Sequence, residues 1–191
     1  GDVTIYQDAN YGGRNTSLGV GSYNLASLIA KGFKNDDMSS LKVPFGYKVT
    51  IYQDDNFSGK SKVITSDASY IGNDWNDQMS SKVEKARYKI INRHSGLCLD
   101  VAGANKASGT NVQQCQANGN VAQEWEIDFN KDDSTYILKS ALTGKALDMD
   151  DWSQNNGGNA IIWDNNKTNN QRWYITMVDG EYSFLINKHS N

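Results

Sequence analysis

The sequence predicts an all-β protein made of two halves, each of which is internally repeated. Short runs rich in β-branched residues stand between Gly, Asn and Asp turns, a pattern typical of short strands. In the first half, the segment 6–13 recurs as 52–59 at an offset of 46 residues. In the second half, from Tyr88 onward, a different repeat has an offset of 48 residues. Internal repeats constrain a fold more firmly than local propensity does.

The elements of the first half are expected in a simple order. Strands are predicted over residues 3–6, 48–52 and 60–65, because each run is β-branched and ends at turn residues. One short helical turn is predicted over residues 25–30. These elements place an aromatic hairpin at the start of each repeat.

Each repeat of the first half also ends in an oxygen-rich loop. The hexapeptide at 35–40 reads Asn-Asp-Asp-Met-Ser-Ser, and the one at 76–81 reads Asn-Asp-Gln-Met-Ser-Ser. Carboxylate, amide and hydroxyl oxygens are hard ligands, and Ca²⁺ takes six to eight such oxygens, including backbone carbonyls. The two loops therefore indicate calcium binding.

With these motifs, the first half resembles a microbial βγ-crystallin domain of the calcium-binding type, over residues 1–87. The hairpin signature of that family, aromatic-x₄-aromatic-x-Gly, is met at 6–13 and at 52–59. The family's calcium signature, [Asn/Asp]-[Asn/Asp]-x-x-[Ser/Thr]-Ser, is met by both loops. The resemblance implies two Greek keys packed face to face as a sandwich.

The resemblance also implies two Ca²⁺ ions, each drawing on both repeats. The carbonyl at the third loop position and the hydroxyl at the fifth would bind each ion, and acidic loop residues and a carbonyl beside the hairpin aromatic would complete the shells. The residues matched in this way are Gln7, Asn35, Asp36, Asp37, Ser39, Gln53, Asn76, Asp77, Gln78 and Ser80.

The second half, residues 88–191, resembles a ricin B-chain-type lectin, a β-trefoil of three lobes each closed by Gln-x-Trp. Leu99-Asp100 returns as Leu147-Asp148, and the Gln-x-Trp at 123–125 returns at 171–173. A third start is visible, because 91–95 returns at 186–190. This third repeat stops before its Leu-Asp and Gln-x-Trp, so a partial β-trefoil of about two lobes is expected. Its open edges predict either a fragment of a longer protein or self-association with another chain.

A sugar site needs a carboxylate for adjacent hydroxyls, an aromatic face under the ring and amides for the remaining hydroxyls. The resemblance places these roles in the second lobe. The first lobe has Cys115 and Ala122 at the positions of the aromatic and of the Asn, so it is interpreted as degenerate. The Gln of Gln-x-Trp has an alternative structural role, and Trp125 and Trp173 are expected in the core. The candidate glycan-binding residues are Asp148, Trp163, Asn170 and Gln171.

The two cysteines, Cys98 and Cys115, leave two alternatives open. They could form one disulfide after export, because lectins of this family often carry a bridge within a lobe. Its second Cys usually lies two residues further along, where this chain has Ala117, so two buried free thiols are the alternative.

Several function classes are excluded by composition and motifs. The net charge is −3, so the basic face that nucleic-acid binding needs is not expected. No apolar run approaches the roughly 18 residues that span a membrane. No Ser/His/Asp set, His-x-x-x-His pair or phosphate-binding glycine loop is present, and His94 and His189 occupy equivalent turn positions. An enzyme is therefore not expected.

The sequence thus predicts a secreted, non-catalytic protein that binds calcium and a glycan or polysaccharide. One alternative is a structural or stress-related calcium-binding protein whose lectin-like half is an interaction scaffold. Another is the non-catalytic part of a larger secreted glycoside hydrolase. An inhibitor or toxin built on a βγ-crystallin is a third class, which no sequence feature singles out.

Overall fold

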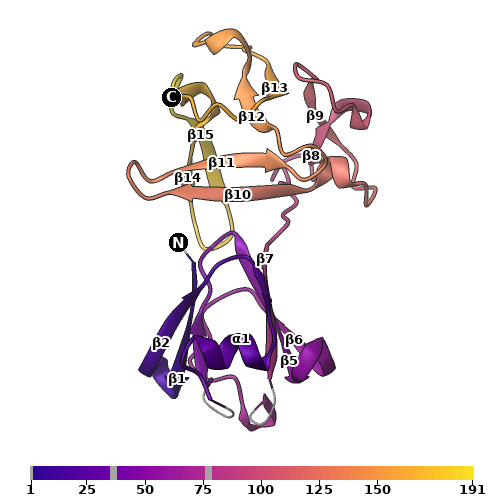
Figure 1. Cartoon of the computed structure of the whole chain (residues 1–191). Helices are drawn as coiled ribbons and strands as arrows, with labels where there is room; N and C mark the ends of the chain where they lie inside the picture. Colours follow the sequence, from indigo (N-terminus) through magenta and orange to yellow (C-terminus); the bar gives the residue numbers. More distant parts are fainter. Residues whose placement is uncertain (1, 35–37, 76–78) are drawn as a thin grey trace. The chain divides into compact units, whose positions relative to one another are not determined.

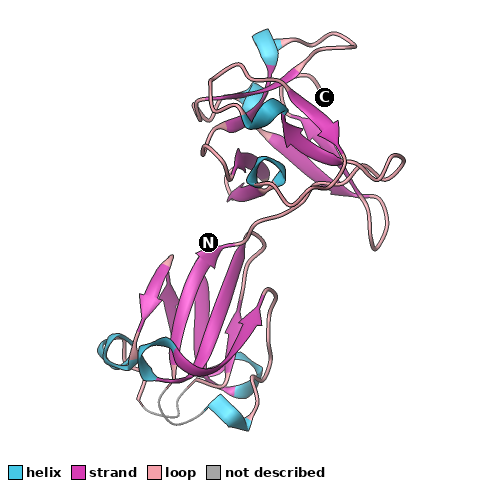
Figure 2. Ribbon diagram, turned by 90° about the vertical axis from the view of Figure 1, so that its right-hand side faces the viewer, coloured by secondary structure: helices cyan, strands magenta, loops and turns pink. Residues whose placement is uncertain are grey.

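The computed structural model describes residues 2–34, 38–75 and 79–191 (Figure 1). The chain divides into two compact units, residues 1–86 and 87–191. Strands dominate the regular structure of both units (Figure 2), and α1 (Leu25–Ala30) is the sole α-helix among the described residues. The predicted all-β class is confirmed, and α1 occupies the predicted helical turn. Its N-terminus is capped by Asn24, whose side chain accepts a 2.9 Å hydrogen bond from the Ser27 N–H.

The first unit is a two-sheet sandwich in which the repeats exchange strands. The sheet orders are β2-β1-β4 and β3-β7-β5-β6. β3 comes from the first repeat but pairs with β7 of the second, and Ala68 of the second repeat bridges Leu41 of the first. The predicted pair of Greek keys is therefore one interlocked unit. Its strands are β1 (Val3–Asp8), β2 (Gly12–Leu18), β3 (Gly21–Tyr23), β4 (Ser40–Lys42), β5 (Tyr47–Asp54), β6 (Ser58–Ile64) and β7 (Ser80–Lys85).

Alternation of side chains along the strands builds the core of this sandwich. Val3 and Ile5 of β1 and Val49 and Ile51 of β5 all point inward and are fully buried. They join one apolar cluster with the buried side chain of Leu28 in α1. Burial of this cluster is the main favourable term for the unit.

The two hairpins explain the repeated aromatic and glycine positions. The ring of Tyr6 lies edge to face on that of Tyr11, with 5.7 Å between centroids. The glycine that closes each hairpin has a positive φ, +71° at Gly13 and +75° at Gly59. A Cβ atom at Gly13 would overlap the carboxylate of Asp8, and one at Gly59 would overlap that of Asp54. Both the backbone conformation and the close approach therefore require glycine.

The second unit contains two complete lobes and the first strand of a third. The lobes pair through β10 with β11 and through β14 with β15. Its strands are β8 (Cys98–Val101), β9 (Val112–Cys115), β10 (Trp125–Asn130), β11 (Thr135–Ser140), β12 (Ala146–Met149), β13 (Ala160–Trp163), β14 (Trp173–Met177) and β15 (Ser183–Asn187).

The Gln-x-Trp motif closes each complete lobe in the same way. The indole N–H of Trp125 donates to the carbonyl of Leu99 at 3.1 Å, and that of Trp173 donates to the carbonyl of Leu147 at 3.0 Å. Both indoles are buried in one apolar cluster. The expectation that these two tryptophans belong to the core is confirmed.

An apolar cavity lies between the start of the third repeat and the first lobe. A cavity of about 590 Å³ lies between residues 90–99 and residues 178–185. The side chains of Ile91, Val178 and Phe184 line it and are exposed. At its rim, the guanidinium of Arg93 lies 4.1 Å above the ring of Tyr182. This cavity therefore exposes apolar side chains from both segments.

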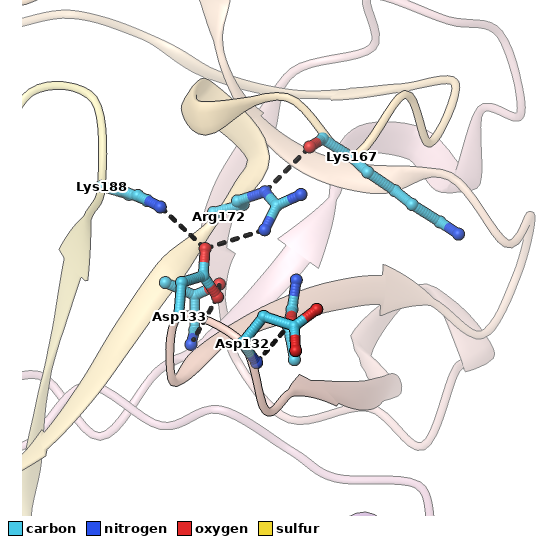
Figure 3. A network of polar contacts seen from close by, with 7 residues as sticks. Asp132, Asp133, Lys167, Arg172 and Lys188 are labelled. Carbon is cyan, nitrogen blue, oxygen red and sulfur yellow. Dashed lines mark hydrogen bonds and ion pairs between the residues drawn. The ribbon is translucent and has the colours of Figure 1, made fainter.

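A half-buried carboxylate fixes the third repeat to the second (Figure 3). Asp133, in the turn between β10 and β11, accepts from Arg172 at 2.8 Å and from Lys188 at 2.7 Å. Burial alone raises the pKa of Asp133, but hydrogen bonds from Lys188, Thr135 and Arg172 outweigh it and hold the pKa well below its ordinary range. The carboxylate therefore connects the second Gln-x-Trp with the residues that follow β15.

Asp133→Asn should destabilise the second unit in a way that depends on pH. A carboxylate with a lowered folded pKa stabilises the fold above the unfolded pKa of about 3.9, and this contribution disappears as pH falls toward the folded pKa. We expect a loss of about 1–3 kcal/mol at pH 7 and a smaller difference from the wild type at pH 2–3. Urea unfolding at both pH values measures this. Asp132→Asn is the matched control, and an equal loss in that variant would contradict the role of Asp133.

Candidate functional site

The calcium residues predicted in the first unit fall into two groups. Gln7, Gln53, Ser39 and Ser80 are described by the structure. The other predicted ligands, Asn35, Asp36, Asp37, Asn76, Asp77 and Gln78, lie outside the described residues.

Gln7 and Gln53 occupy equivalent irregularities in their strands. The pairing of β1 with β2 shifts register between Tyr6 and Asp8, and that of β5 with β6 shifts between Tyr52 and Asp54. As a result, neither glutamine has a partner residue in the described strand registers. A β-bulge of this kind disrupts the ladder locally and leaves backbone groups for other ligands. A backbone carbonyl at such a bulge is an oxygen ligand of the kind that Ca²⁺ accepts.

The serines of the two loops are not equivalent. In the first repeat, Ser40 is the partner of Tyr6, whereas in the second repeat Ser80 is the partner of Tyr52. The sequence explains this difference, because Leu41 separates the first serine pair from Lys42, whereas Lys82 directly follows the second pair. In strand register, Ser80 therefore corresponds to Ser40 and not to Ser39.

Hydrogen bonding assigns the same structural work to Ser40 and Ser80. The Ser40 hydroxyl accepts from the Tyr11 N–H at 3.0 Å and donates to the Asp8 carbonyl at 2.6 Å. The Ser80 hydroxyl accepts from the Phe57 N–H at 2.8 Å and donates to the Asp54 carbonyl at 2.7 Å. Ser80 is 0% exposed, and these two bonds use its one hydrogen and one of its two lone pairs. Its predicted role as a calcium ligand therefore competes with fastening a hairpin.

The glycan residues predicted in the second unit gather around one cavity. This cavity of about 370 Å³ is lined by all four predicted residues, together with acidic and polar neighbours. Asp148 comes from β12, Trp163 from the end of β13, and Asn170 and Gln171 from the 3₁₀ helix Asn169–Gln171. Trp163 is 43% exposed, so its ring is open to a ligand, whereas Asp148 and Asn170 are buried side chains at the cavity wall.

Gln171 orients the carboxylate of this cavity. Its Nε2 donates to Asp148 Oδ2 at 2.8 Å and to the Asp164 carbonyl at 2.9 Å, while its Oε1 accepts from the Asn166 N–H at 2.9 Å. Because Gln171 is 0% exposed and bonded at both ends, its amide acts through Asp148. The structural alternative for this glutamine agrees with these contacts.

The environment of Asp148 makes it an unusual carboxyl group. Burial raises the pKa of Asp148 and the nearby Asp150 charge raises it further, although hydrogen bonds from Gln171 and Asn170 oppose the shift. An ionised carboxylate held in this way is an acceptor for ligand hydroxyls.

The equivalent carboxylate of the first lobe, Asp100, has a different pair of hydrogen-bond partners. Asp100 accepts from Gln123 at 3.0 Å on one oxygen and from Gln113 at 3.1 Å on the other. The repeat places Ile161 at the position of Gln113, and an isoleucine side chain has no donor. Each oxygen of Asp100 thus accepts one bond from a glutamine, and this lobe has Cys115 and Ala122 where the second lobe has Trp163 and Asn170.

The cavity also contains residues that sequence reasoning missed. Asp150, Asp151 and Trp152, in the 3₁₀ helix Asp150–Trp152, contribute to its lining. A signal was available in the 48-residue repeat, because Trp152 stands where the first lobe has Ala104. A large aromatic in one lobe only is typical of a role outside the shared core.

The two cysteines are neighbours across a strand pair. Cys98 of β8 and Cys115 of β9 are register partners, and both are free thiols. Cys98 is buried and Cys115 is half-buried.

None of the helices in the described part of the chain has the length and apolar character needed to cross a membrane.

Two family models match different parts of the chain. A family model described as "Ricin-type beta-trefoil lectin domain-like" matches residues 74–163 and 133–191, which together span more than half of the chain. A model of "Peptidase inhibitor family I36" matches residues 1–64. The two overlapping lectin matches reflect the repeated lobes.

Similar proteins exist for each unit. A βγ-crystallin domain from Clostridium beijerinckii is 44% identical, covering 45% of this chain and 100% of that chain, with a TM-score of 0.43. The designed three-fold symmetric protein ThreeFoil is 35% identical, covering 55% of this chain and 74% of that chain, with a TM-score of 0.52. Development-specific protein S from Myxococcus xanthus is 34% identical over 71 residues, or 37% of this chain and 41% of the relative. The chain spans less than half the length of the curated relatives it matches.

Fold and sites together define an all-β protein that joins a crystallin-type Greek-key sandwich to a lectin-type trefoil unit. The assignment of the first unit rests on sequence identity along the whole length of the C. beijerinckii domain. The chain belongs to the ricin-type β-trefoil lectin domain-like family, and its first unit is a βγ-crystallin domain.

Proposed function

We propose that this chain is a non-catalytic binding protein that takes up Ca²⁺ in its first unit and a glycan in the second lobe of its second unit. The observation that carries the glycan function is the cavity in which the Asp148 carboxylate, the exposed Trp163 ring and the Asn170 amide meet. These groups supply the acceptor, the apolar face and the amide that a sugar ring needs.

A glycan array probed with the whole chain, with and without EDTA, tests this function. Binding in both conditions assigns recognition to the second unit alone. Binding that EDTA abolishes makes calcium part of recognition. Failure to bind any neutral or charged glycan would contradict the proposed function and favour the interaction-scaffold alternative.

For calcium, we propose two ions held by the oxygens of the two loops and by the carbonyls of Gln7 and Gln53. A hard cation supplies charge neutralisation among these oxygens and links the two repeats when it is bound. Because Ser80 fastens a hairpin, we propose that only Ser39 contributes a hydroxyl to an ion. The half-buried position of Ser39 supports this assignment.

Alanine variants of three serines test the calcium proposal. Ser39→Ala should weaken calcium binding and reduce the calcium-dependent rise in Tm, while leaving the metal-free Tm unchanged. In the wild type this rise corresponds to about 2.7 kcal/mol at a hundredfold excess over Kd. Titration calorimetry and thermal melts with and without Ca²⁺ measure both quantities, and uptake of fewer than two ions by the wild type would count against two sites.

Ser80→Ala should instead resemble Ser40→Ala, the matched control. Either change leaves a backbone N–H and a carbonyl without their serine partner, so both should lose about 1–3 kcal/mol with or without calcium. If Ser80→Ala kept the metal-free Tm and lost the calcium gain, Ser80 would be a ligand after all.

The match of residues 1–64 to a peptidase inhibitor family favours a second candidate function, inhibition of a peptidase by the first unit. Residual activity of a panel of serine, cysteine and metallopeptidases, measured against increasing concentrations of this chain, tests it. Stoichiometric inhibition of one class would support it, and unaffected rates across the panel would reject it.

A further inference from the structure

Trp152 is an exposed indole on the wall of the candidate glycan cavity. It is 47% exposed and lines the same cavity as Asp148 and the predicted platform Trp163. Two large apolar rings are therefore open to one ligand space of about 370 Å³, a size ordinary for small-molecule sites.

The backbone at Trp152 is in a conformation that bulky residues rarely adopt. The φ angle is +53° at Asp151 and +53° at Trp152. The first lobe has the same turn with Gly103 and Ala104, at φ +62° and +51°. A small side chain therefore suffices for the turn, and a Trp in this conformation is an outlier that needs an explanation.

The ring of Trp152 is also held in place. It packs edge to face on His189, with 5.0 Å between centroids and 85° between planes. His189 is fixed in turn by Gln154, whose Nε2 donates to the His189 carbonyl at 3.2 Å. The start of the third repeat thus orients an indole whose exposed surface adds nothing to the core.

Charge restricts the ligand that could use this second ring. Asp148, Asp150 and Asp151 line the cavity, whereas no Lys or Arg is among its lining residues in the described chain. Like charges brought together on binding are unfavourable, so anionic sugars are disfavoured. An uncharged glycan meets no such repulsion.

Resting on the proposed glycan function, we propose that Trp152 is a second aromatic platform that contacts a second sugar unit, so that the site recognises an uncharged glycan of at least two units. Trp163, Asp148 and Asn170 then hold the first unit. Each indole presents an apolar face to the C–H side of one ring. Because the equivalent turn of the first lobe forms with Ala104 in place of Trp152, removal of the Trp152 indole should leave the fold intact.

Titration calorimetry with neutral disaccharides tests the inference. The probes are lactose, cellobiose, maltose and chitobiose, each beside its own monosaccharides, on wild type, Trp152→Gly and Trp163→Ala. Trp152→Gly should lower the affinity for the preferred disaccharide about tenfold and leave the affinity for the monosaccharide unchanged. Its Tm should be unchanged or higher, since glycine accepts the positive φ. Trp163→Ala should weaken binding of both.

The outcomes separate this inference from the proposed function. If the wild type binds and Trp152→Gly binds the disaccharide equally well, the second platform is wrong and glycan binding stands. If Trp152→Gly loses the monosaccharide as well, one sugar lies between both rings and the two-unit assignment is overturned. A lower Tm with unchanged affinity would assign the indole to packing on His189. If the wild type binds none of the probes nor any glycan of an array, the proposed function fails and this inference with it.

Discussion

Trp173→Ala should cost the second unit about 3–5 kcal/mol, the usual loss for truncation of a buried Trp. Its indole is buried in the cluster shared by both lobes, and its N–H donates to the Leu147 carbonyl at 3.0 Å. Truncation removes the packing and leaves that carbonyl without its partner. Against a typical domain stability of about 5–15 kcal/mol, this loss removes a large fraction of the stability of the second unit.

Trp163→Ala is the matched comparison, because Trp163 belongs to the same lobe but is 43% exposed. We expect a stability change within about 0.5 kcal/mol and loss of most glycan binding. Thermal melts beside glycan binding measure both variants. If Trp163→Ala unfolded the unit and Trp173→Ala did not, Trp163 would be the core residue and Trp173 the residue that contacts the glycan. If neither changed binding, the second unit would be a scaffold.

Repeats made most of this fold predictable. The recurrence of the hairpin at 6–13 and 52–59 depends on steric demands that are the same in both copies, notably a glycine beside an aspartate carboxylate. The Gln-x-Trp motifs are equally local, since Gln123 and Gln171 make the same three kinds of hydrogen bond. Such motifs encode their own contacts and can be read without the structure.

The parts that escaped prediction depend on register and on backbone conformation. The hexapeptides containing Ser39 and Ser80 look equivalent, but the strand that follows the second one begins a residue earlier. A match to the hexapeptide motif does not specify where the following strand begins. The hydrogen bonds of Ser80 to its hairpin could therefore not be predicted from the motif. Trp152 likewise stands on a turn with positive φ angles, a backbone conformation that the pattern of side chains in the sequence does not reveal.

The same register shift places Ser81 in an unfavourable environment. It occupies the register position of Leu41, opposite Ile51, and its hydroxyl is buried without a hydrogen-bond partner among the described residues. A buried, unpaired hydroxyl typically costs about 1–3 kcal/mol. The earlier start of the strand in the second repeat therefore places Ser80 at its hairpin but leaves the Ser81 hydroxyl unpaired, which lowers the stability of the first unit.

Asp148→Asn should greatly weaken glycan binding without destabilising the fold. The ionised carboxylate is the proposed acceptor for two ligand hydroxyls, and replacement by a neutral amide should lower affinity by about 100-fold, or about 2.7 kcal/mol. The stability of Asp148→Asn at neutral pH should be equal to or higher than that of the wild type. Because burial and the Asp150 charge raise the pKa of Asp148, its ionised form disfavours folding at neutral pH, and this cost disappears as pH falls below the unfolded pKa. Asn removes the cost and can still accept the bond from Gln171.

Calorimetry and melts at pH 7 and pH 4 measure both effects, with Asp100→Asn as the control in the first lobe. Wild-type affinity should fall toward acid from a higher pH than an ordinary aspartate, of pKa about 3.9, would give, because the raised pKa protonates Asp148 earlier. Asp100→Asn should leave glycan binding intact, since the first lobe has Cys115 and Ala122 in place of the aromatic and the Asn of the second lobe. A marked loss of stability in Asp148→Asn, or equal binding by both variants, would place recognition outside this carboxylate.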